Sequence, residues 1–193
     1  MTLNLVLAST SPYRRILLER LGIPFRCVAP RFDEANFPGE GLDPRSLAEA
    51  LAVGKALSVE AELPDATIIG SDQLVALEGR VFGKPGSAEK AVEQLEAMSG
   101  RSHQLVTAMV VRHQGQTIRH VDLTNLHMRA LDLDAIRRYV ERDRPYDCAG
   151  SYKLEAAGIT LFDRIETDDQ TAITGLPLIA LTSILRGLGY PIP

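Results

Sequence analysis

Several features that would place this chain in a common class are missing from its sequence. Two cysteines, Cys27 and Cys148, are too few for a disulfide framework, and we interpret both as small apolar filler in a reducing compartment. The four histidines show no metal-ligand spacing, which argues against a zinc site. No Gly-x-x-x-x-Gly-Lys-Ser/Thr segment is present, so we do not expect a P-loop enzyme.

Long apolar runs, a signal-peptide pattern and basic blocks are also missing. The formal net charge is −4, and nothing in the sequence points to a nucleic acid polymer as a partner. We therefore expect a cytoplasmic protein that binds neither membranes nor nucleic acid polymers; the sequence leaves a homodimer open. The 193 residues contain no repeat and no clean linker, which predicts a single domain spanning residues 1–193.

The hydrophobic periodicity that is present predicts a mixed α/β fold. Strand and helix patterns alternate early in the chain, whereas pairs of alternating strands dominate later. Helices are predicted after the caps Ser11, Asp43, Ser87 and Asp132, and over residues 177–188. Strands are predicted at 5–7, 23–27, 67–69, 74–77, 105–111, 118–128 and 159–162.

The first strand leads into a polar corner. Residues 5–7 are apolar, and Ser9 and Ser11 lie in the turn that follows. Ser11 precedes a proline, which is a strong helix-start signal, and the new helix carries Arg14 and Arg15 in its first turn. Free N–H groups, the helix dipole and two guanidiniums favour an anion site. The alternative is an ordinary helix cap with two solvated arginines.

Four other charged residues are candidates for chemistry. Asp72 follows a buried strand and a glycine, so it is either a base or metal ligand at a strand end or a turn aspartate. Lys84, between Gly83 and Pro85, could hold a phosphate as a point charge, but a solvated loop lysine is the commoner case. Lys55, at a helix end, is equally compatible with a phosphate role and with a solvated face. Glu34 lies in an acidic loop, where solvation is the default.

Four motifs occur in one order along nearly the whole chain. They are Ala-Ser-Thr-Ser-Pro-Tyr-Arg-Arg at 8–15, Gly-Ser-Asp-Gln at 70–73, Gly-Lys-Pro at 83–85 and Cys-Ala-Gly-Ser-Tyr-Lys-Leu-Glu at 148–155. In this the chain resembles the Maf family of nucleoside triphosphate pyrophosphatases. The resemblance implies a single Maf/ITPase-like domain with a central mixed sheet, flanking helices and a nucleotide-binding cleft between two lobes.

The resemblance also implies roles for the charged residues. Asp72 would be the general base, and Glu34 with Asp72 would hold a divalent cation, Mg²⁺ or Mn²⁺, as the cofactor. The reaction would release pyrophosphate from a nucleoside triphosphate, with positioning and electrostatics supplying most of the acceleration. The residues expected to bind the phosphates are Ser9, Ser11, Arg14, Arg15, Lys55 and Lys84.

Three departures from the commonest family pattern concern recognition of the nucleobase of the substrate. Tyr13 stands where an arginine is usual, Gln73 where a threonine is usual, and Glu155 where a glutamine is usual. All three resemble the subfamily that hydrolyses 7-methylguanosine triphosphate to 7-methyl-GMP and diphosphate. A tyrosine can stack on the cationic methylated ring, and a carboxylate can accept hydrogen bonds from guanine. A glutamine offers both a donor and an acceptor to the edge of the nucleobase. The alternatives are a pyrophosphatase for other canonical or damaged nucleotides, such as dTTP or UTP, and a nucleotide-binding protein with a regulatory role in cell division.

Overall fold

The computed structural model describes residues 4–34 and 36–193 of the chain. Those residues fall into two compact units. Unit 1 comprises the described residues of Met1–Asp72 with Thr107–Asp122 and Asp169–Pro193, and unit 2 comprises Gln73–Val106 with Leu123–Asp168. Three long strands contribute residues to both units: β3 (Thr67–Leu77), β5 (Ser102–His113) and β6 (Gln116–Met128). The expectation of a single domain over residues 1–193 stays a prediction.

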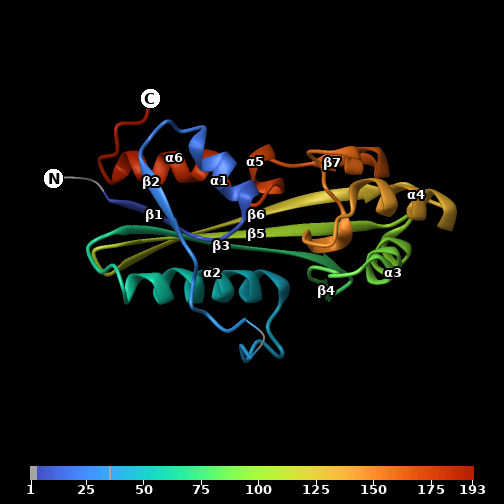
Figure 1. The fold of residues 1–193 in the computed structure, drawn as a ribbon, viewed down its shortest axis with the longest axis horizontal. Helices are drawn as coiled ribbons and strands as arrows, with labels where there is room; N and C mark the ends of the chain where they lie inside the picture. Colours follow the sequence, from blue (N-terminus) through green and yellow to red (C-terminus); the bar gives the residue numbers. More distant parts are fainter. Residues whose placement is uncertain (1–3, 35) are drawn as a thin grey trace. The chain divides into compact units, whose positions relative to one another are not determined.

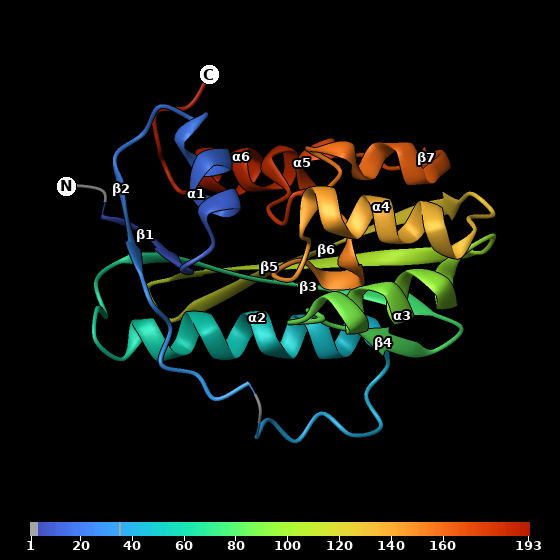
Figure 2. The same cartoon turned by 45° about the vertical axis from the view of Figure 1, so that its right-hand side comes forward.

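Unit 1 is built on parallel strands. Strand β1 (Leu5–Ala8) pairs in parallel with β2 (Phe25–Val28) on one side and with β3 on the other. In both views, α2 lies on one face of these strands, and α1 and α6 lie on the other (Figure 1 and Figure 2). The unit 1 helices are α1 (Pro12–Glu19), α2 (Pro44–Glu60), α5 (Gln170–Ile173) and α6 (Leu178–Gly187).

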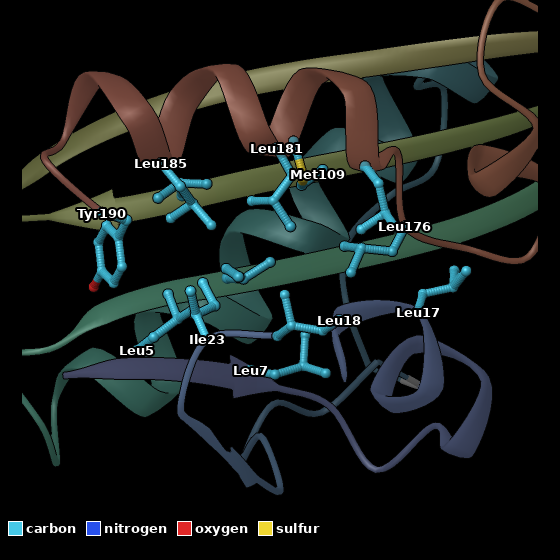
Figure 3. Packing of buried hydrophobic residues seen from close by; sticks show 13 residues of the cluster. Leu5, Leu7, Leu17, Leu18, Ile23, Met109, Leu176, Leu181, Leu185 and Tyr190 are labelled. Atoms are coloured by element: carbon cyan, nitrogen blue, oxygen red, sulfur yellow. The ribbon is translucent and has the colours of Figure 1, made fainter. Parts of the chain in front are cut away.

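The core of unit 1 fixes the elements that carry the polar corner. One cluster of buried apolar side chains joins β1, α1, β3, β5 and the segment that leads into α6 (Figure 3). Leu17 and Leu18 anchor α1 in this cluster, and Leu176, which is fully buried, anchors the turn before α6. Burial of such leucines stabilises the fold by about 1.5–3 kcal/mol each. The backbone on either side of them is therefore firmly held.

Unit 2 contains a hairpin and a helical layer. Strand β4 (Arg80–Phe82) pairs antiparallel with β3, and β7 (Phe162–Glu166) pairs antiparallel with β6. Helix α3 (Ala88–Met98) packs against α4 (Leu133–Asp143), and the short 3₁₀ helices η1 (Ala149–Ser151) and η2 (Ala157–Leu161) follow. The buried rings of His103, Tyr152 and Phe162 contact one another inside this unit.

The strand order confirms the predicted fold class. Among the described residues, seven strands are ordered β2-β1-β3-β5-β6-β7, with β4 paired to β3. Parallel pairs occur early in the chain and antiparallel pairs later, so the fold is mixed α/β. The described helices include none that is both long and apolar enough to cross a bilayer.

Two predicted elements were placed wrongly. The apolar run at 159–162 was expected to be a strand, but most of it is η2, and the strand begins only at Phe162. A short apolar run does not separate helix from strand. Here the Phe162 N–H donates to the Ile159 carbonyl three residues earlier, which is the bond of a 3₁₀ turn. The strand predicted to end at Gly70 instead continues to Leu77, so Asp72 lies within β3 and not after it.

The interpretation of Cys27 as apolar filler was also wrong. It is exposed on β2, and only Cys148 is partly buried. Burial raises the pKa of the Cys148 thiol to about 12, so this side chain is neutral at physiological pH.

Candidate active site

The centre of the candidate site is a lysine held between two carboxylates. The Lys55 ammonium lies 2.5 Å from Oδ1 of Asp72 and 3.0 Å from Oε1 of Glu34. The side chains of Lys55 and Asp72 are only 9% and 10% exposed, whereas that of Glu34 is 52% exposed. The structure therefore brings Lys55, which was predicted to bind phosphate, between Glu34 and Asp72, the two residues predicted to hold a metal ion together.

Small residues on α2 and β3 allow this contact. Ala52 and Ala56 are fully buried on α2, and Gly70 of β3 lies so close that a Cβ there would be 2.9 Å from the Cβ of Ala56. Lys55 lies well inside α2, so its expected place at a helix end was wrong. Its burial also rules out the solvated face that was the alternative for this residue.

The polar corner after β1 has the local structure that its sequence predicts. The Ser11 side chain caps α1 by accepting a bond from the Arg14 N–H, and the Ser9 hydroxyl accepts one from the Ser11 N–H. The Arg14 side chain turns inward, and its Nε–H donates to the Gly175 carbonyl over 2.9 Å. Desolvation lowers the pKa of Arg14, and the nearby negative charges of Asp72 and Glu34 oppose this shift.

Arg15 takes a different position from its neighbour. Its guanidinium forms an exposed (i, i+4) pair with Glu19 on the same helix. The hydrogen bond and charge of Glu19 raise the pKa of Arg15. Arg14 and not Arg15 is therefore the arginine whose charge is coupled to Asp72; a phosphate role for Arg15 stays a prediction.

The remaining candidates lie on several elements. In unit 1, Tyr13 is half-buried on α1. In unit 2, Gln73 is half-buried on β3, Glu155 is exposed in the turn between η1 and η2, and Lys84 is exposed. The loop that carries Lys84 is tied to the η1 segment, because Gly150 N–H donates to the Gly83 carbonyl. The roles assigned to these four residues stay predictions.

The donor set fits only part of a metal site. Glu34 and Asp72 offer hard carboxylate oxygens that approach the same ammonium, and such oxygens suit Mg²⁺ or Mn²⁺. Within residues 4–34 and 36–193, no group of three or more His, Cys, Asp or Glu could hold a metal ion. The protein would thus supply two ligands, and phosphate oxygens and water would have to supply the others.

Two residues of the site were not singled out from the sequence. The Ser71 hydroxyl is fully buried and donates to the Gly175 carbonyl over 2.8 Å. Gly175 itself has a φ of +105°, a conformation that side chains rarely adopt. A glycine just before Leu-Pro signals a turn in the sequence, but nothing in that signal identifies which side chains the turn would hold.

Comparison with known proteins identifies the family of this chain. The model of the family described as Maf-like protein matches residues 4–188. The chain belongs to the Maf family. This Maf protein is 48% identical over 190 residues to a protein of Xanthomonas axonopodis pv. citri named 7-methyl-GTP pyrophosphatase, covering 98% of this chain and 99% of that one.

Further relatives of this Maf protein carry the same name. One from Bdellovibrio bacteriovorus is 49% identical over 183 residues, covering 95% of this chain and 96% of the relative. One from Aromatoleum aromaticum is 49% identical over 192 residues, covering 98% of each. The solved structure of the Staphylococcus aureus Ham1 protein aligns with a TM-score of 0.50 at 15% identity, covering 95% of this chain and 98% of that one, so it supports the fold alone.

Proposed function

We propose that this Maf protein hydrolyses 7-methyl-GTP to 7-methyl-GMP and diphosphate. The observation that carries the chemistry is the buried Asp72 carboxylate, held by Lys55 and electrostatically coupled to Arg14 at the start of α1. The substrate is proposed because relatives that are 48–49% identical over nearly their full length bear that name.

Asp72 is the proposed general base. Lys55 fixes the orientation of its carboxylate. A water oxygen would attack the α-phosphorus as its proton passes to Asp72. The bond from the α-phosphorus to the bridging oxygen would break, and the electron pair would leave with the pyrophosphate.

The cations of the chain would neutralise the triphosphate. Arg14 offers the Nη groups that Gly175 does not engage, and the N-terminus of α1 adds its positive dipole end. Lys84 is proposed as a further phosphate contact in the reaction. A divalent cation held by Glu34, Asp72 and phosphate oxygens would supply additional charge neutralisation.

Three residues are proposed to select the nucleobase of the substrate. The negative charge of Glu155 would complement the N1–H and amino group of guanine and the positive charge of the methylated ring. Tyr13 would supply a stacking face, worth about 0.5–2 kcal/mol toward a cationic ring. Gln73 would offer a donor and an acceptor to the base edge.

Replacement of Asp72 tests the chemistry. Asp72→Asn keeps the shape of the side chain but removes the base, so kcat for 7-methyl-GTP should fall by about a hundredfold or more. Asp65→Asn, at an exposed position just before β3, is the matched control and should retain wild-type turnover. Wild-type turnover in Asp72→Asn would exclude Asp72 as the base.

A nucleotide panel tests the substrate separately. Pyrophosphate release is compared for 7-methyl-GTP, GTP, dTTP and UTP, in wild type, Glu155→Gln and Tyr13→Ala. Glu155→Gln should lower the preference for 7-methyl-GTP over GTP by about tenfold, the effect of about 1.4 kcal/mol. A wild-type protein that prefers dTTP or UTP would contradict the proposed substrate and leave the pyrophosphatase chemistry standing. Turnover of none of the four would contradict the chemistry as well.

A further inference from the structure

The carbonyl oxygen of Gly175 is a shared acceptor in unit 1. It accepts from Arg14 Nε over 2.9 Å and from the buried Ser71 hydroxyl over 2.8 Å. Arg14 comes from α1, Ser71 from β3 next to Asp72, and Gly175 from the turn between α5 and α6. One backbone atom therefore links the cationic corner to the strand that carries the proposed base.

The Gly175 turn is held by hydrogen bonds on both sides. Asp169, which is buried, accepts from the N–H and hydroxyl of Thr171 and from the N–H of Ile179. The Thr171 hydroxyl accepts from the N–H of Leu178. Leu176, directly after Gly175, is fully buried in the unit 1 core (Figure 3). Such a turn can set the position of a side chain because hydrogen bonds and the burial of Leu176 fix its own backbone.

We propose that Gly175 is the positioning residue for Arg14. A guanidinium has five N–H donors in a rigid plane. When Nε is bound to the Gly175 carbonyl, the plane is fixed and the two Nη groups stay available for an oxyanion. This inference rests on the proposed function, in which Arg14 contacts the phosphates.

The requirement for glycine at this position follows from the same geometry. An added Cβ would lie 3.2 Å from Arg14 Nε and 3.7 Å from one Nη, and the φ of +105° would strain any other residue. Gly175→Ala should therefore displace the guanidinium from its carbonyl acceptor. The substitution leaves the charge of Arg14 unchanged.

A double-mutant cycle separates positioning from a loss of stability. Gly175→Ala is made in the wild type and in Arg14→Ala, and kcat/KM for 7-methyl-GTP and the Kd of inorganic pyrophosphate are measured for all four proteins. If Gly175 acts through Arg14, its replacement should lower both kcat/KM and pyrophosphate affinity about tenfold in the wild-type background. The same replacement should lower them less than about twofold once Arg14 is absent. Equal losses in both backgrounds would overturn the proposal.

Two controls keep the outcome clear. Gly189→Ala introduces a similar backbone strain, with φ +86° and no atom within 4 Å of its Cβ, and should leave pyrophosphate affinity unchanged. If Gly175→Ala does not fold, Ser71→Ala replaces it in the cycle, because the Ser71 hydroxyl is the second donor that fixes the orientation of the Gly175 carbonyl. Without it the carbonyl orients Arg14 less well, so the loss of pyrophosphate affinity should again be smaller once Arg14 is absent. A wild type without turnover would refute the proposed function, while the pyrophosphate cycle would still decide the role of Gly175.

Discussion

At the residue scale, the Lys55 ammonium is the group on which the two site carboxylates depend. Lys55 and Asp72 are about nine-tenths buried, so removal of either partner leaves a charge that has lost most of its hydration. The pair with Glu34 matters less, because half of that carboxylate is exposed to water. Stability should therefore respond mainly to the loss of the Lys55–Asp72 contact.

Lys55→Met should destabilise the protein by about 3–5 kcal/mol, since it leaves the buried Asp72 carboxylate without its ammonium. The double variant Lys55→Met/Asp72→Asn should recover part of this loss, because no buried charge remains. Urea unfolding at neutral pH measures both values. Arg119→Met is the control: it breaks a more exposed pair with Glu49 and should cost less than about 1 kcal/mol. A Lys55→Met cost no larger than that of the control would contradict this account.

At the element scale, the contact between α2 and β3 decides where Lys55 and Asp72 meet. Gly70 is the residue that permits it, because a Cβ there would collide with the carbonyl oxygen of Ala52 in the helix backbone. A helix carbonyl cannot move aside as the end of a flexible side chain can. The packing of these two elements is thus set by the lack of a side chain at Gly70.

Gly70→Ala should cost about 1–3 kcal/mol, the usual effect of overpacking a core, and should lower activity by shifting β3 near Asp72. Gly187→Ala, in the last turn of α6 with no atom within 4 Å of its Cβ, is the matched control. This control should be neutral or slightly stabilising, because alanine favours a helix over glycine. Thermal unfolding and turnover of the two variants test the argument, and equal stabilities would refute it.

The elements differ in how far the sequence could predict them. Caps at Ser11, Asp43 and Ser87 act through neighbouring backbone N–H groups, so local sequence suffices, and the structure confirms them. A glycine alone suggested a strand end at Gly70, whereas β3 continues through it and the missing side chain lets the strand approach α2. The local pattern around Gly70 does not reveal that contact. The shared role of the Gly175 carbonyl could not be predicted, because it depends on three distant segments and on a backbone atom.

At the scale of the whole molecule, the global stability is coupled to pH through a residue of unit 2. His103 is 3% exposed, and its Nδ1 has no hydrogen-bond partner among the described residues. Its Nε2 lies 3.2 Å from the Tyr152 hydroxyl. Burial, together with the charge of His127, lowers the pKa of His103 from 6.5 to about 4. Between these two pH values, the unfolded chain binds more protons at this residue than the folded one does.

The sign of the pH dependence follows from that difference. The stability that the neutral His103 contributes is present above pH 6.5 and is lost as the pH falls toward 4, because protonation of His103 favours the unfolded chain. Protonation of His103 should therefore lower the free energy of unfolding by about 2 kcal/mol between pH 6.5 and 4.5. His103→Phe keeps an aromatic ring beside Tyr152 and Phe162 but does not titrate, so the free energy of unfolding should fall by about 2 kcal/mol less over this interval than in wild type.

Tyr152→Phe separates titration from the loss of a hydrogen bond. It removes the hydroxyl that contacts His103 but leaves the imidazole buried, and burial is the main cause of the lowered pKa. Its stability should be lower at every pH, with the slope of the wild type. Burial raises the pKa of Tyr152 itself, so this phenol does not titrate in the acid range in which the variants are compared. Urea unfolding of the three proteins at pH 4.5, 5.5 and 6.5 gives the slopes, and a wild-type slope in His103→Phe would show that another group carries the acid sensitivity.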